Sequence, residues 1–299
     1  MRTVYLGTSQ FAAGVLRALA ASTHRPSLVV TRPDRPRGRG RRLASPPVAD
    51  AARELGIALD QPASVNDEPA RARIADADPE VVCVCAFGAL IKEPLLSDYE
   101  LLNVHPSLLP RWRGAAPVER AIMAGDERTG VSIMRVTAGL DSGPVCLVGE
   151  EPIGDADTYG TLAARLERTG GELLVQALDR RPPFNDQAEA LATYADKITS
   201  EDRVLDPGHP AVELQRRVRA LTPHIGAAVI LGDGERLGVW QARVLTADGD
   251  QLAPGELSFE GRFPALGCSP GALELQVVQP PGRRQMPGDA FLRGLPGRS

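Results

Sequence analysis

The sequence predicts an α/β protein with a doubly wound, mostly parallel sheet, followed by a smaller C-terminal β-barrel domain. Strand and helix patterns alternate through the first 180 residues, as expected for consecutive βαβ units. After about residue 225, helical patterns give way to short strands separated by glycine-rich turns, which is typical of small barrels. The chain has 299 residues, of which 43% are hydrophobic. This is enough to bury the cores of two ordinary domains.

The elements of the first domain follow from hydrophobic periodicity. Residues 3–7 form a short apolar strand that ends in glycine, and residues 9–21 form an amphipathic helix. A strand at 27–31 is followed by a helix at 46–57, which begins with proline. The remaining strands are expected at 81–87, 101–105, 131–137 and 144–153, and the remaining helices at 116–125 and 161–178.

The boundary between the domains lies in a stretch rich in proline and charge, residues 179–210. We therefore place a first domain at 1–182, a linker at 183–203 and a second domain at 204–299. The second domain is expected to contain a helix at 211–221, a hairpin at 227–245 with a glycine-rich turn, and strands at 255–260 and 272–279.

Composition excludes several classes of protein. The net charge of −4 gives no general argument for nucleic-acid binding, so only local clusters can supply one. No run of 18 apolar residues predicts a membrane span, and the N-terminus does not resemble a signal peptide. The four cysteines show neither zinc-site nor disulfide spacing. We expect a cytoplasmic protein without a bound metal.

Two polar side chains close the strand at 101–105. Asn103 and His105 are two residues apart, so both project from the same face, while Val104 points to the other. An asparagine amide can donate a hydrogen bond to a developing oxyanion, and histidine can accept and return a proton. These are two components of an acyl-transfer site. An isolated N-x-H is more often a satisfied polar pair at a strand end, and the residues alone leave both interpretations open.

The best carboxylate partner for this histidine is Asp141, within "AGLDSGPV" at residues 138–145. It occupies a glycine-flanked turn between two predicted strands, from which a side chain could reach over the sheet edge. A carboxylate beside an imidazole stabilises the imidazolium, although aspartate also favours turns for local reasons. No reactive serine or cysteine stands beside a base, so direct attack by a substrate nucleophile fits better than a covalent intermediate.

Longer stretches carry a resemblance to a known family. "LLNVHPSLLPRWRGAAPVERAIMAGD", "TGVSIMRVTAGLDSGPVCL" and "MPGDAFLRG" closely resemble the methionyl-tRNA formyltransferases, which belong to the folate-dependent formyltransferases. The likeness spans almost the whole chain. Its "NxHPSLLP" core is shared with other folate-dependent formyltransferases, so that core indicates the chemistry more than the acceptor.

The resemblance implies a Rossmann-like formyltransferase domain followed by an OB-like barrel that contacts tRNA. It also implies 10-formyltetrahydrofolate as the donor and Asn103, His105 and Asp141 as the catalytic set. The loop formed by Ser107, Leu108, Leu109 and Pro110 would line the folate pocket. Chemistry suggests the roles: Asn103 stabilises the oxyanion, and His105, oriented by Asp141, removes a proton from the attacking α-amine.

Acceptor recognition is expected in the segment "TRPDRPRGRGRRL", residues 31–43. It contains six arginines and one acid, and arginine forks pair well with phosphate. A solvated, mobile basic loop is the alternative. In the resembled family this loop enters the acceptor end of initiator tRNA. The tRNA-binding residues implied are Arg35, Arg37, Arg39, Arg41 and Arg42, with Arg39 the most important, and Lys197 of the linker.

The sequence departs from the family pattern at "RALTPHIGA", residues 219–227. The family often has a form like R-x-x-N-P-x-P-G-A here, so Thr222, His224 and Ile225 differ. The departure affects the detail of the domain junction and leaves the catalytic residues intact.

We expect a monomeric enzyme of translation initiation whose partners are initiator methionyl-tRNA and the folate donor. Three alternatives remain at this stage. One is a formyltransferase acting on a small amine such as an amino sugar, another is a hydrolase in which water replaces the amine, and the third is a non-catalytic RNA-binding relative. The arginine-rich segment and the second domain argue against the first, and the intact catalytic set argues against the third.

Overall fold

The computed structural model describes the whole chain except residues 38–41, 233, 246–251 and 296–299. It forms two compact units that interleave along the sequence. The sheet unit comprises residues 1–114, 128–152 and 163–194, and the C-terminal unit comprises residues 115–127, 153–162 and 195–299. The domain boundaries expected from the sequence, near residues 182 and 204, stay a prediction, because the C-terminal unit also includes residues 115–127 and 153–162.

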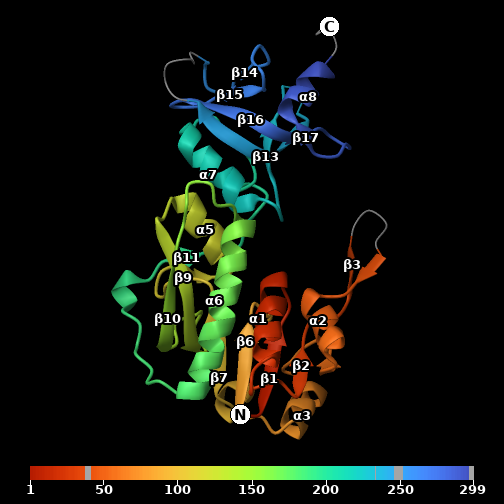
Figure 1. Ribbon diagram of the computed structural model, residues 1–299, viewed down its shortest axis with the longest axis vertical. Helices are drawn as coiled ribbons and strands as arrows, with labels where there is room; N and C mark the ends of the chain where they lie inside the picture. Colours follow the sequence, from red (N-terminus) through yellow and green to blue (C-terminus); the bar gives the residue numbers. More distant parts are fainter. Residues whose placement is uncertain (38–41, 233, 246–251, 296–299) are drawn as a thin grey trace. The chain divides into compact units, whose positions relative to one another are not determined.

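The sheet unit is built on seven strands in the order β10-β9-β7-β6-β1-β2-β5 (Figure 1). Their bounds are β1 Thr3–Gly7, β2 Leu28–Val30, β5 Ala58–Asp60, β6 Val81–Cys85, β7 Leu101–His105, β9 Arg128–Arg135 and β10 Val145–Pro152. The first five run parallel, and β9 and β10 are antiparallel additions at one side. The predicted α/β class with a mostly parallel sheet is confirmed.

Helices cover both faces of this sheet. The helices that lie wholly in the sheet unit are α1 Gln10–Ala20, α2 Pro47–Leu55, α3 Glu68–Asp76 and α4 Leu95–Asp98, and α6 Tyr159–Arg180 begins in the C-terminal unit and continues here. Ser9 caps α1 by accepting a hydrogen bond from the Ala12 amide. On the opposite face, Ile74 of α3 packs with Val82 and Val84 of β6.

A close approach of α6 to β7 fixes the direction of the polar side chains on that strand. A Cβ at Gly170 would lie 2.8 Å from a methyl group of Val104, so glycine is required for this contact. Val104 is therefore packed against α6, and Asn103 and His105 project from the other face.

Sequence patterns missed several short elements. Among them are β5, α3 and a two-stranded hairpin formed by β3 Arg35–Arg37 and β4 Arg42–Ala44. The hairpin follows the carboxyl end of β2 and projects from the sheet unit in Figure 1. With three residues per strand, the hairpin offers too little periodicity to be recognised. Two short strands, β8 Arg113–Gly114 and β11 Tyr194–Ala195, and a 3-10 turn, η1 Glu189–Leu191, were also missed.

The C-terminal unit contains a separate antiparallel sheet in the order β12-β13-β16-β15-β14, with β17 paired to β16. Its elements are α5 Pro117–Ala124, α7 Ala211–Leu221, β12 Ala227–Ile230, β13 Arg236–Leu245, β14 Leu257–Ser258, β15 Ala265–Gly267, β16 Ala272–Gln279, β17 Met286–Pro287 and α8 Gly288–Arg293. Leu214 and Val218 of α7 form one core with Val239 and Leu273 of the sheet. In the described part of the chain, no helix is both long enough and apolar enough to cross a bilayer.

Candidate active site

The candidate site begins with the end of β7, a strand held on both sides. Asn103 is in register with Val84 of β6 and Met134 of β9, and His105 is opposite Ser132. Because the strand is paired with a neighbour on each side, the Cα–Cβ bonds of Asn103 and His105 have little freedom to change direction. Asn103 is partly exposed, and His105 is buried to 4% exposure. This rigid strand therefore presents an amide and an imidazole from the same face.

The imidazole of His105 is oriented by a backbone carbonyl. Its Nε2 lies 2.9 Å from the carbonyl oxygen of Trp112, which can only accept, so Nε2 carries the proton. Nδ1 then bears the lone pair in the neutral ring. Nδ1 lies 3.6 Å from Oδ2 of Asp141, which is too long for a direct hydrogen bond. Asp141 is thus placed to stabilise a proton on Nδ1, while Trp112 fixes the tautomer.

Asp141 reaches His105 because its loop folds back along the sheet. β9 is antiparallel to β7, so the segment 136–144 starts beside Leu101, at the amino end of β7. His105 lies about 13 Å further along that strand, within the reach of about 17 Å of five extended residues. The loop therefore runs back along β7 for its carboxylate to come within 3.6 Å of His105. Asp141 has a φ of 45°, and its Oδ2 accepts from the Gly114 amide at 2.9 Å.

The structure thus brings Asp141 to His105 and leaves Asn103 as the strand neighbour of His105. Within the described residues, no hydrogen bond engages the side-chain amide of Asn103. The amide donors of Asn103 are therefore available to a ligand at the same face as Nδ1 of His105. The catalytic roles assigned to these residues remain predictions.

Ser132 holds the loop that follows β7. Its hydroxyl donates to the carbonyl of Ser107 at 2.8 Å and accepts from the amide of Leu109 at 3.1 Å. Ser107 is fully buried, and its own hydroxyl donates to the Arg111 carbonyl at 2.6 Å. Ser107 therefore acts inside the loop and is not exposed at its surface. Leu108 packs over Gly130 on β9, where a Cβ would lie 2.5 Å from its methyl group.

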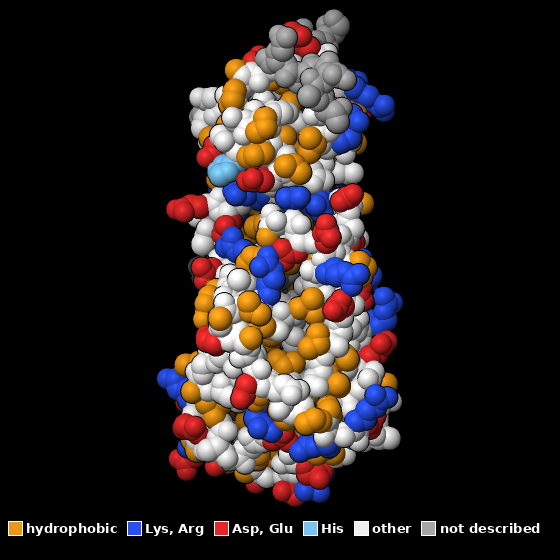
Figure 2. Space-filling model, turned by 90° about the vertical axis from the view of Figure 1, so that its left-hand side faces the viewer, with side chains coloured by type: hydrophobic (Ala, Val, Ile, Leu, Met, Phe, Trp, Pro, Cys, Tyr) orange, Lys and Arg blue, Asp and Glu red, His pale blue; other side chains and the backbone are white. Residues whose placement is uncertain are grey.

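Leu109 and Pro110 line a cavity of about 260 Å³ in the sheet unit. The other walls come from residues 145–148 of β10 and residues 185–188 of the predicted linker. Figure 2 views the molecule from the side of β10 and shows hydrophobic side chains gathered there between scattered acidic and basic ones. Two of the four predicted folate-lining residues thus border a cavity, and their ligand remains a prediction.

Sequence reasoning missed a second loop at this edge of the sheet, residues 86–94 after β6. β6 is the neighbour of β7, so its carboxyl end lies beside the candidate site. Thr8 donates to the carbonyl of Phe87, and Asn66 binds the carbonyl of Leu90 and the amide of Lys92. The loop is therefore held in place, and its exposed Leu90 faces solvent. Strand order would have revealed this loop, but strand order cannot be read from the sequence alone.

Three of the five predicted tRNA-binding arginines lie on the described strands of the β3–β4 hairpin. Arg35 is exposed on β3, and the backbones of Arg37 and Arg42 are in register across the hairpin. Arg39 and Arg41 fall outside the described residues. In the C-terminal unit, Lys197 is exposed.

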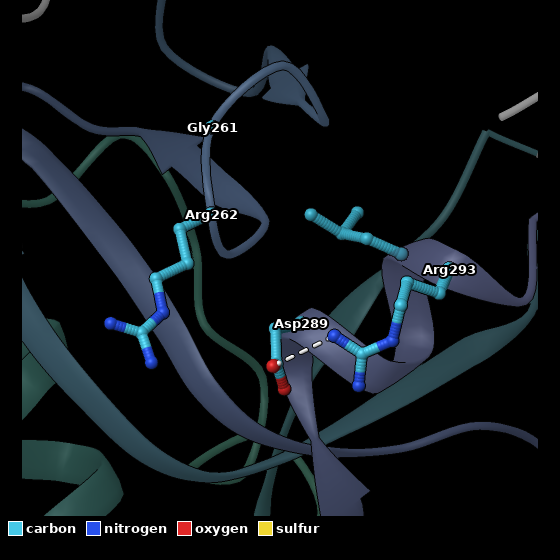
Figure 3. Close-up of a pocket in the computed structure, with 5 residues that line it drawn as sticks. Gly261, Arg262, Asp289 and Arg293 are labelled. Carbon is cyan, nitrogen blue, oxygen red and sulfur yellow. Dashed lines mark hydrogen bonds and ion pairs between the residues drawn. The ribbon is translucent and has the colours of Figure 1, made fainter. Parts of the chain in front are cut away.

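The C-terminal unit has a cavity of its own, of about 360 Å³, whose described lining includes Arg262, Asp289 and Arg293 (Figure 3). Arg293 donates to Asp289 at 3.0 Å, and this bond holds the pKa of that carboxyl below its usual range. Two guanidinium groups and one carboxylate leave a net charge of +1 at the described wall, which suits a small anion.

The two cysteines of β6, Cys83 and Cys85, are not nucleophiles of this site. Burial raises the pKa of both Cys83 and Cys85 to about 12, so neither forms a thiolate near neutral pH. In the described ranges, no cluster of three or more His, Cys, Asp or Glu side chains could hold a metal ion. The chemistry this arrangement supports is proton transfer and oxyanion binding.

Comparison with known proteins decides the family. A model described as formyl transferase matches residues 1–178, and one described as formyl transferase, C-terminal domain, matches residues 197–296. The methionyl-tRNA formyltransferase of Methylobacillus flagellatus is 41% identical over 303 residues, covering 99% of this chain and 97% of that protein. That of Methylococcus capsulatus is 42% identical over 298 residues, covering 98% and 96%. The chain belongs to the methionyl-tRNA formyltransferase family.

The resemblance seen in the sequence, and the prediction of an enzyme, are thereby confirmed. HypX from Aquifex aeolicus, in a crystal structure with tetrahydrofolic acid, has a TM-score of 0.66 at 18% identity, covering 98% of this chain and 47% of that one. At this identity the likeness shows the fold of the formyltransferase alone.

Proposed function

We propose that this formyltransferase transfers the formyl group of 10-formyltetrahydrofolate to the α-amine of initiator methionyl-tRNA, in the cytoplasm, at the start of protein synthesis. One observation carries the proposal: an asparagine amide with no hydrogen-bond partner among the described residues and Nδ1 of a histidine share one strand face, with a carboxylate 3.6 Å from Nδ1. These are the groups that direct attack of an amine on a formyl carbon requires.

Asn103 supplies the oxyanion donor in this proposal. As the amine nitrogen bonds to the formyl carbon, negative charge develops on the formyl oxygen. The Asn103 amide is presented by a strand that is paired on both sides, so its N–H donors need no reorganisation when that charge appears. Preorganised donors of this kind typically contribute about 10²–10³ to turnover.

His105 and Asp141 handle the proton. The attacking nitrogen becomes positively charged and loses its proton to Nδ1 of His105, and Asp141 stabilises the resulting imidazolium. The bond between the formyl carbon and N10 then breaks, with the electron pair leaving on N10. Nδ1 returns the proton to N10, so the products are tetrahydrofolate and the formylated amine. The ring keeps its orientation throughout, because the Trp112 carbonyl holds Nε2.

The donor has apolar side chains available on the loops around the site. Leu90 and Leu140 are 68% and 62% exposed, and Leu140 precedes the catalytic aspartate directly. Large exposed apolar groups at a site fit the flat rings of a folate. We place Leu108, Leu109 and Pro110 in the donor pocket as well, while Ser107 maintains the shape of their loop.

The acceptor is recognised through phosphate groups by the β3–β4 hairpin in this proposal. The hairpin follows the carboxyl end of β2, the edge of the sheet at which His105 also lies. Arg35, Arg37, Arg39, Arg41 and Arg42 supply positive charge, with Arg39 as the principal contact. Lys197 adds a contact from the C-terminal unit. A guanidinium group can pair with a phosphate group through two parallel N–H donors.

A side-by-side acceptor assay tests the proposed function. Purified protein and 10-formyltetrahydrofolate are incubated with initiator Met-tRNA, elongator Met-tRNA or a free amino sugar, and the formylated product is measured. The expected result is rapid formylation of the initiator tRNA and slow or no formylation of the other two. Activity on the sugar amine alone would replace this proposal with a small-amine formyltransferase, and release of formate without any acceptor would indicate a hydrolase.

A further inference from the structure

Gln187 connects the predicted linker to the loop that carries Asp141. It lies in the sheet unit, in the segment that follows α6. Its Nε2 donates to the carbonyl of Asp141 at 2.8 Å and to the carbonyl of Gly143 at 2.6 Å. Its Oε1 accepts from Nε of Arg113 at 3.0 Å. One side chain thus spans two separate segments next to the candidate site.

The partners of Gln187 determine how its amide is oriented. Arg113 can only donate, and the two carbonyl oxygens can only accept. Flipping the amide would place its NH₂ group against the guanidinium and its oxygen against two carbonyl oxygens. Only the observed orientation satisfies all three contacts, so the donor and acceptor halves have separate tasks.

The Arg113 side chain, which donates to Gln187, is itself held in place. Its side chain is 1% exposed, and its two terminal nitrogens donate to the two carboxylate oxygens of Glu189 at 3.0 and 2.9 Å. That bond raises the pKa of the guanidinium further. The next residue, Gly114, donates its amide to Oδ2 of Asp141. Asp141 is therefore held through its carboxylate by the chain at Gly114 and through its backbone by Gln187.

The loop at Asp141 needs such support. It connects β9 to β10 beyond the ladder that pairs these two strands, so its carbonyls must find other donors. Asp141 also has a positive φ of 45°, a strained conformation for a residue with a side chain. Gln187 satisfies the carbonyls on both sides of Ser142, which fixes the part of the loop that presents the carboxylate.

We propose that Gln187 is a positioning residue for formyl transfer: it holds the 137–143 loop so that the Asp141 carboxylate stays close to Nδ1 of His105. The inference rests on the proposed function, because it assigns Gln187 a role that acts through Asp141. Misplacement of a catalytic group by about 1 Å can cost about 10²-fold in rate, so the effect is expected in kcat.

The variant Gln187→Glu distinguishes the contacts of Gln187 with the Asp141 loop from its contact with Arg113. Glutamate keeps an oxygen for Arg113, so the attachment persists, but it replaces the NH₂ donor with an oxygen that faces two carbonyls. We expect kcat to fall about 10- to 100-fold, with KM for both substrates changed less than about twofold. Ala190→Glu, at an exposed position of η1, adds the same charge without touching the bridge and is the matched control. A normal kcat in Gln187→Glu would overturn the inference.

A double-mutant cycle with Asp141→Asn identifies the residue through which Gln187 acts. If Gln187 works by placing the Asp141 carboxylate, adding Gln187→Glu to Asp141→Asn causes less than about a twofold further loss. A full, multiplicative loss in the double variant would overturn the inference while leaving the role of Asp141 intact. If Asp141→Asn alone retains normal turnover, the proposed role of Asp141 fails, and the positioning role of Gln187 fails with it.

Discussion

Nδ1 of His105 lies 3.6 Å from the Asp141 carboxylate, while Nε2 of the same ring is bonded to the Trp112 carbonyl at 2.9 Å. The two ring nitrogens therefore have different tasks. Nε2 is committed to the backbone and fixes the tautomer, and Nδ1 is the atom that can exchange a proton with a substrate. At 3.6 Å, the carboxylate makes no direct hydrogen bond to the ring. It stands where a positive charge on the ring would be stabilised.

Replacement of Asn103 tests the oxyanion role. We expect Asn103→Ala to lower kcat by about 10²–10³, because the developing negative charge loses a preorganised donor. Binding of Met-tRNA, measured by filter retention, is expected to change little. Asn103→Asp is the matched variant: it keeps the size of the side chain and removes its N–H donors, so it should be equally impaired. Full turnover in either variant would exclude Asn103 as the oxyanion donor.

Ser132 gives a prediction about stability near the site. Its buried hydroxyl bridges the Ser107 carbonyl and the Leu109 amide. Ser132→Ala leaves those buried groups without their partner, so we expect a loss of about 1–3 kcal/mol in the free energy of unfolding. Urea denaturation followed by fluorescence measures it. Ser97→Ala, which removes an exposed hydroxyl bonded to the Pro94 carbonyl, is the control, and an equal loss in both would contradict the bridging role.

Hydrophobic periodicity predicted the strands of this site, but it could not predict how those strands pair in the sheet. The strand at 101–105 and the common face of Asn103 and His105 follow from alternation alone. The path of the Asp141 loop depends on β9 running antiparallel to β7, a pairing that local patterns do not encode. The same holds for Gln187, whose partners lie 44 to 74 residues away in the sequence.

His224 of the C-terminal unit is another residue whose contacts local sequence patterns do not encode. The sequence marked this residue only as a departure from the family pattern. In the structure, its Nε2 lies 2.9 Å from the Glu119 carboxylate, and its ring stacks on Tyr159 at 3.7 Å. Glu119 is 105 residues away in the sequence, so no local signal could have predicted this pair. The departure from the pattern is therefore accommodated by specific contacts within this unit.

If the arginine-rich hairpin binds tRNA, replacing one of its arginines should affect tRNA recognition and leave formyl transfer to a small amine unchanged. We expect Arg39→Ala to reduce discrimination between initiator and elongator Met-tRNA, and to have little effect on formylation of a minimal amine such as methionine methyl ester. Loss of a phosphate contact would also make binding less sensitive to salt, by about one unit of the logarithmic slope. The assay is kcat/KM for each acceptor at several salt concentrations. Arg128→Ala, on an exposed arginine paired with Glu150, is the control. Equal losses on tRNA and on the minimal amine would remove Arg39 from recognition.

Asp202 predicts how the stability of the C-terminal unit varies with pH. Its carboxylate accepts two hydrogen bonds from Arg120 of α5, at 2.8 and 3.0 Å. This pairing is the main reason that the pKa of Asp202 falls to about 2 from its ordinary 3.8. A carboxyl whose pKa is lower in the folded state stabilises the fold fully above the unfolded-state pKa of about 3.9. That contribution disappears as the pH falls through the folded-state value.

The measurement compares wild type and Asp202→Asn by urea unfolding between pH 7 and pH 2.5. At pH 5–7 we expect the variant to be less stable, because it lacks the charge that Arg120 binds. The difference should narrow steadily below about pH 4, where the wild-type group begins to take up a proton in the unfolded state. Asp196→Asn, on an exposed residue of the same segment, should change stability by less than about 0.5 kcal/mol at pH 7. A difference between wild type and Asp202→Asn that stays constant down to pH 2.5 would show that the ion pair does not stabilise the fold. Linkage requires the stabilisation to shrink as the pH falls below the unfolded-state pKa of about 3.9.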